Sequence, residues 1–92
     1  MDEHARRMLN RFVVAVENFR AGTFSLMDVS RCAGQTAATI DNASAPFPSL
    51  LKSAEGDLEF AYFATELEEH GAELERIVLP IVAALNAQPE AL

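Results

Sequence analysis

The chain has 92 residues, 50% of them hydrophobic and 23% charged, which predicts one globular domain over residues 1–92. Fourteen acids against seven Lys and Arg give a formal net charge of −7. Because nucleic-acid binding relies on cations, we expect no nucleic-acid partner. The single cysteine, Cys32, excludes an internal disulfide and a thiolate-rich zinc site. Stability must therefore come from packing, within one subunit or between subunits.

The sequence predicts two helices in its first half, near residues 4–20 and 25–41. Gly22 can adopt the left-handed conformation that ends a helix. Ser25 and Asp28 then resemble a capping box, with Asp in place of the usual Glu. The first helix has apolar residues at steps of three and four, which is typical of an amphipathic helix: Met8, Leu9, Phe12, Val13, Val16 and Phe19.

Residues 42–49 contain Asn, Ser and two prolines, which indicates a connection between helices. Two further helices are predicted near 48–70 and 72–86, with a bend at Gly71 and a kink at Pro80, where an amide donor is missing. No alternating apolar pattern indicates a strand. We therefore expect an all-α bundle of three or four helices.

The predicted helix over 48–70 carries apolar residues on two opposite faces. One face includes Leu51 and Leu58, and the other begins at Phe60 and Phe63. The second face continues past Gly71 as a heptad seam: Phe60, Phe63, Leu67, His70, Leu74, Ile77, Ile81 and Ala84. An unbroken rod over this length would be about 55 Å long and would need a second subunit to cover it. We favour the bend over the rod.

A helix with two apolar faces needs two surfaces to pack against, so we expect a homodimer. The residues predicted for self-association are Phe60, Phe63, Leu67, His70 and Leu74. Two interpretations of His70 remain open. It is either a polar member of the seam that fixes subunit register or an exposed histidine at a helix end, and we favour the exposed position.

The acids concentrate in the second half, where nine lie between Leu51 and the C-terminus against Lys52 and Arg76. This asymmetry indicates either a solvated surface that maintains solubility or a binding surface for a basic protein. The residues predicted for partner binding are Glu55, Glu59, Glu66, Glu69 and Glu73.

The sequence contains no motif that indicates catalysis or a cofactor. Glu66 and His70 are four residues apart, which departs from the Glu-x-x-His spacing of di-iron bundles. Nothing near Cys32 supplies a base, and no Gly-rich phosphate loop is present. We expect no catalytic residues, no cofactor and no metal, with a metal-binding bundle as one alternative.

The chain starts with charged residues and without the apolar segment of a secretory signal. Its longest apolar stretch, Ile77 to Leu85, contains Pro80 and is shorter than the ~20 residues of a membrane-spanning helix. The many alanines and the preference for Arg over Lys suggest a bacterial source. We therefore expect a cytoplasmic bacterial protein without a membrane partner.

The stretch from Phe19 to Asp28 combines an aromatic helix end, a glycine turn and a capped second helix. It resembles the opening hairpin of small helical bacterial immunity proteins of the colicin type. This resemblance implies a short acidic protein that covers a basic, nucleic-acid-cleaving toxin. The principal expectation is a small acidic non-enzymatic interaction protein that self-associates and binds a protein partner; an immunity-like inhibitor is the alternative.

Overall fold

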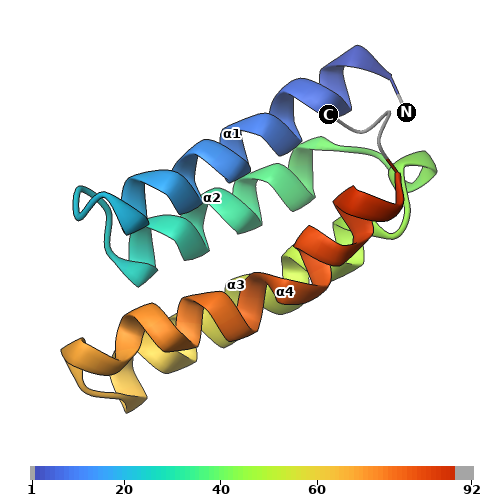
Figure 1. The fold of residues 1–92 in the computed structure, drawn as a ribbon. Coiled ribbons are helices and arrows are strands. Elements are labelled where there is room, and N and C mark those ends of the chain that lie inside the picture. The colour runs from blue at the N-terminus through green and yellow to red at the C-terminus, as the bar shows by residue number, and fades with distance from the viewer. Residues whose placement is uncertain (1, 89–92) are drawn as a thin grey trace.

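Four α-helices make up the structure, a computed structural model that describes residues 2–88 (Figure 1). They are α1 (Glu3–Arg20), α2 (Leu26–Thr39), α3 (Phe47–Ala64) and α4 (His70–Ala87). Two short 3-10 helices, η1 (Asn42–Ser44) and η2 (Leu67–Glu69), lie in the connections. No strand occurs in residues 2–88. The prediction of an all-α bundle is confirmed.

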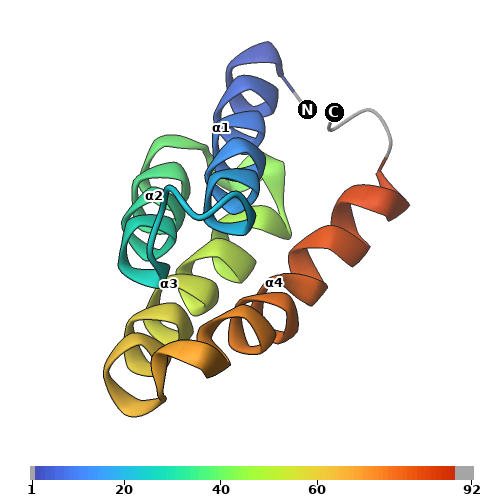
Figure 2. The same ribbon diagram turned by 60° about the vertical axis from the view of Figure 1, so that its left-hand side comes forward.

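Consecutive helices run in opposite directions along the bundle (Figure 1). The most extensive helix contact joins α2 to α3, while α1 packs on α2 and α4 packs on α3. Figure 2 shows α3 between α2 and α4. Two sides of α3 are therefore occupied by other helices of the same subunit.

The first two helices begin and end within two residues of their predicted bounds. The Asp2 carboxylate accepts a hydrogen bond of 2.7 Å from the Ala5 amide, and Gly22 has a φ of +85° after the end of α1. The capping box at the start of α2 is present in both directions between Ser25 and Asp28. Local hydrogen bonding thus defines the α1–α2 hairpin.

One apolar core runs between the four helices. Each helix contributes a stripe of side chains to it, and α3 contributes Leu51, Ala54, Leu58 and Ala61, as predicted for its first face. The largest side chains that are almost fully buried are Leu9, Phe12, Leu26, Phe47, Leu51, Leu58, Leu74 and Ile81. The radius of gyration of 12.4 Å and the longest extent of 38 Å contradict the alternative of a continuous rod.

The break between α3 and α4 lies earlier than predicted. The bend was expected at Gly71, but α3 ends at Ala64, Thr65 is extended, and α4 begins at His70. Gly71 lies inside the first turn of α4, and the chain continues as one helix through Pro80. Of the predicted bounds 48–70 and 72–86, the end at 70 and the start at 72 are therefore wrong.

Side-chain chemistry explains the earlier break. The Ala61 carbonyl accepts both the Thr65 amide and, at 2.7 Å, the Thr65 hydroxyl, so Thr65 closes the last turn of α3. In one continuous helix, Glu66, Glu69 and Glu73 would repel one another at spacings of three and four residues. The break instead places these acids at the start of α4, where the helix dipole favours negative charge.

The predicted heptad seam is divided by this turn. Leu74, Ile77 and Ile81 are at most 6% exposed and belong to the core of the subunit. By contrast, Phe60, Phe63 and Leu67 point away from the core. The chain reverses direction between the two groups, so residues that share one seam in the sequence lie on different surfaces.

A long-range ion pair joins α1 to α4. The Arg20 guanidinium donates two hydrogen bonds to the Glu75 carboxylate, with distances of 2.9 and 2.8 Å. These hydrogen bonds hold the pKa of Glu75 below its usual range. Both side chains are about half exposed, so the pair contributes little more than a surface salt bridge.

We expect Leu74→Ala to lower the free energy of unfolding by about 2–5 kcal/mol, because it leaves a cavity in the core. Leu79→Ala is the matched control on the same helix, since Leu79 is 64% exposed. It should change the free energy by less than about 0.5 kcal/mol. Urea unfolding measures both. Equal effects would contradict the burial of Leu74.

We expect Glu75→Gln to lower the free energy of unfolding at neutral pH by at most about 1 kcal/mol. Since the pKa of Glu75 is lowered in the folded state, its stabilisation exists above the unfolded pKa and disappears as the pH falls through the folded one. The free energies of unfolding of the two proteins, measured with urea, should therefore converge once the pH lies below the folded pKa of Glu75. A difference that persists there would assign the effect to packing.

Candidate functional site

Three large apolar side chains are exposed together where α3 ends. Phe60, Phe63 and Leu67 are 74%, 73% and 79% exposed. Phe60 and Phe63 lie about one turn apart on α3, and Leu67 begins η2. We call these three residues the apolar patch. Clustered exposure of large apolar side chains is typical of a protein interaction surface.

The turn beneath the apolar patch is held by Tyr62 and His70. The Tyr62 ring contacts the Phe63 ring edge to face, with centroids 5.0 Å apart. On its other side, the Tyr62 ring lies 5.9 Å from the His70 ring. The His70 Nε2 atom lies 3.3 Å from the Thr65 carbonyl oxygen, within hydrogen-bond distance. Packing and hydrogen bonding therefore give the patch a defined backbone.

Two residues predicted for self-association do not belong to the exposed surface. His70 is 6% exposed and Leu74 is fully buried. The favoured interpretation of His70 as an exposed helix-end residue is wrong, because its ring packs beside Tyr62. Neither residue can contact a second subunit without opening the core, so the self-association candidates reduce to the apolar patch.

The five glutamates predicted for partner binding do not share one face. Glu55 points toward α2, where its carboxylate lies over Gly34, and it also forms a 3.0 Å ion pair with Lys52. Glu73 is only partly exposed and pairs with Arg76. These two carboxylates are therefore largely neutralised by neighbours on their own helices.

The remaining acids lie near the apolar patch. Glu59 is exposed on α3, and Glu66, Glu68 and Glu69 are exposed in the turn between α3 and α4. Among residues 2–88, none of these four carboxylates forms a salt bridge. The apolar patch therefore has an unneutralised acidic border. The sequence pattern predicted three of these acids as partner-binding residues. It omitted Glu68, although Glu68 belongs to the same run of acids.

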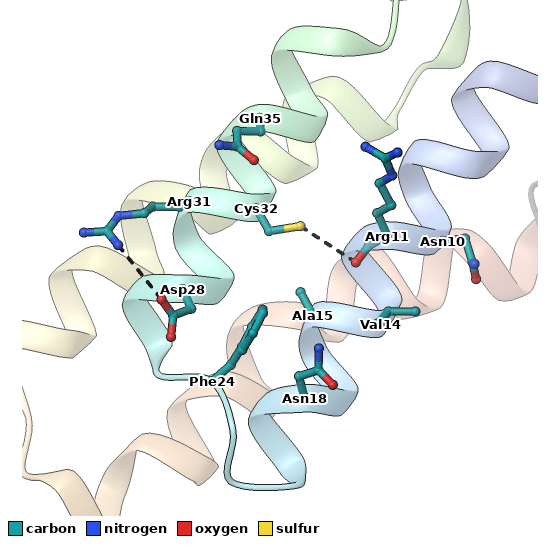
Figure 3. Close-up of a pocket in the computed structure, with 10 residues that line it drawn as sticks. All are labelled: Asn10, Arg11, Val14, Ala15, Asn18, Phe24, Asp28, Arg31, Cys32 and Gln35. Atoms are coloured by element: carbon teal, nitrogen blue, oxygen red, sulfur yellow. Dashed lines mark hydrogen bonds and ion pairs between the residues drawn. The ribbon is translucent and has the colours of Figure 1, made fainter.

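A separate shallow groove of about 410 Å³ lies between α1 and α2 (Figure 3). Arg11 and Arg31 flank it, and Arg31 forms a 3.9 Å ion pair with Asp28. The Cys32 thiol lies in this groove, 3.8 Å from the Arg11 carbonyl oxygen (Figure 3). The lining residues are Asn10, Arg11, Val14, Ala15, Asn18, Phe24, Asp28, Arg31, Cys32 and Gln35.

The chemistry of this groove does not favour a reactive thiol. Partial burial raises the pKa of Cys32, against smaller opposing effects of Thr36 and Arg11. No histidine lines the groove. A protonated thiol without a neighbouring base is a poor nucleophile, so Cys32 acts here as a small packing residue.

In the part of the chain from 2 to 88, no three His, Cys, Asp or Glu side chains come together as metal ligands. Over the same residues, every helix is too short or too polar to traverse a bilayer. The chain matches no protein-family model, no curated protein and no solved structure. The apolar patch with its acidic border is therefore the candidate site that geometry supports best.

Proposed function

We propose that the protein is a non-enzymatic helical interaction protein that forms a homodimer through the apolar patch and offers its acidic surface to a protein partner. The observation that carries this proposal is the exposure of Phe60 and Phe63 on α3 and of Leu67 just after it. The homodimer and the partner surface involve different chemistry, apolar burial in one case and charge in the other.

Apolar burial supports the homodimer. Full burial of a phenylalanine side chain contributes about 1.5–3 kcal/mol, and two copies together would cover four such rings. The core of the subunit is already closed without them, so Phe60 and Phe63 bury little apolar area within a monomer. A second surface that covers these rings accounts for their presence.

The acidic border supports a second candidate function, an inhibitor of a basic protein. Glu59, Glu66, Glu68 and Glu69 are exposed and form no salt bridge within residues 2–88. A cluster of free carboxylates accelerates association with a cationic partner in a salt-dependent manner. The immunity-like hypothesis requires a surface of this charge.

For the homodimer, we expect light scattering at about 50 μM to give twice the subunit mass of 10.0 kDa. The double variant Phe60→Gln, Phe63→Gln should give the subunit mass, because Gln keeps helix propensity but removes the apolar area. Leu79→Gln is the control, since Leu79 is also exposed but lies outside the patch. A wild-type protein at the subunit mass would overturn the homodimer.

For the inhibitor, we expect a basic protein to co-purify from the native host at low salt. Its association rate, measured by stopped flow with the purified pair, should fall at least about tenfold between 0.02 and 0.5 M salt, because surface charges become screened. The triple variant Glu66→Gln, Glu68→Gln, Glu69→Gln should associate slowly at all salt concentrations. An association rate independent of salt would contradict this function.

A further inference from the structure

We infer that the partner on the apolar patch is a second copy of this chain, with the two α3 helices antiparallel across a two-fold axis near the middle of the helix. This inference rests on the proposed self-association and specifies its geometry. It follows from how large and small side chains are ordered along the outward side of α3, and from the charges beside them.

The outward side of α3 forms a seam of exposed residues at steps of four and three. They are Ser49, Ser53, Gly56, Phe60 and Phe63, all within α3. This seam lies opposite the buried face formed by Leu51, Ala54, Leu58 and Ala61. Its spacing is that of the contact positions in a two-helix coiled coil.

The first half of this seam is small and the second half is large. Beside Gly56 there is open space, since a side chain starting there would meet no atom of the subunit within 4 Å. In an antiparallel pair, Gly56 faces Phe60 of the partner subunit, and Ser53 faces Phe63 of the partner subunit. Both layers therefore combine a small residue with a large one.

A parallel pair would not fit as well. Phe60 would face Phe60 of the partner subunit and Gly56 would face Gly56, which crowds one half of the interface and leaves gaps in the other. Interiors that pack at normal density alternate large and small side chains across facing positions. The order of sizes along α3 therefore favours the antiparallel arrangement.

The flanking charges predict a weakness of this orientation. Near the axis, Glu59 would approach Glu59 of the partner subunit on the same side. This repulsion between identical residues is specific to the antiparallel arrangement.

The first test fills the small half of the seam. We expect Gly56→Leu to weaken the homodimer at least about tenfold, because Leu occupies the space that Phe60 of the partner subunit needs. The folded subunit should be no less stable, because Leu has the higher helix propensity and Gly56 is exposed. Ala83→Leu, also at an exposed helical position, is the control and should not weaken the dimer. Analytical ultracentrifugation measures the dissociation constants.

The second test removes the repulsion near the axis. We expect Glu59→Gln to tighten the homodimer several-fold at low salt, and the gain should shrink as salt screens the wild-type repulsion. Glu3→Gln makes the same change in net charge on α1, away from the seam, and should have a smaller effect.

The outcomes separate this geometry from the proposed function. The double variant Phe60→Gln, Phe63→Gln could lose the dimer while Gly56→Leu retains full affinity. That result would support self-association through the apolar patch and overturn the antiparallel arrangement. An equal effect of Glu59→Gln and Glu3→Gln would also overturn it. A wild-type monomer would remove both proposals together.

Discussion

The packing of α3 between α2 and α4 is the constraint on which the rest of the structure depends. Its buried stripe, from Leu51 to Ala61, packs against these two neighbours. Helix α1 completes the core by packing on α2 and by its ion pair from Arg20 to Glu75 of α4. With only four helices, none remains to cover the outward side of α3. A small domain therefore exposes Phe60 and Phe63 as a direct consequence of how few elements it has.

Much of the fold could be predicted from local chemistry. The Ser25–Asp28 capping box and the left-handed Gly22 are short-range features, and a sequence specifies them without knowledge of the tertiary structure. The break at Thr65 was missed because no glycine or proline marks it. A run of acids after Thr65, which is more favourable at a helix start than inside a helix, favours the break instead.

The helical spacing of apolar residues predicted part of the candidate site but not all of it. Period alone identified Phe60 and Phe63 as neighbours, because residues on one helix keep their relative positions. The same period also placed Leu74 in the exposed seam, but Leu74 lies in the core. The chain reverses direction between α3 and α4, so the helical period of α3 does not predict which side chains of α4 face outward. The burial of His70 depends on Tyr62 and the Thr65 carbonyl, which only the folded turn brings together.

Charge would govern whether the proposed self-association and the proposed partner binding can occur in the same small protein. Two copies with a net charge of −7 repel each other, but at physiological ionic strength this repulsion acts over only about 8 Å. Only acids at the interface, such as Glu59, therefore oppose a dimer. The carboxylates of Glu68 and Glu69 lie in the turn beyond the end of α3. Dimerisation would then double the acidic surface offered to a cationic partner, and added salt would weaken that contact while relieving the repulsion between the copies.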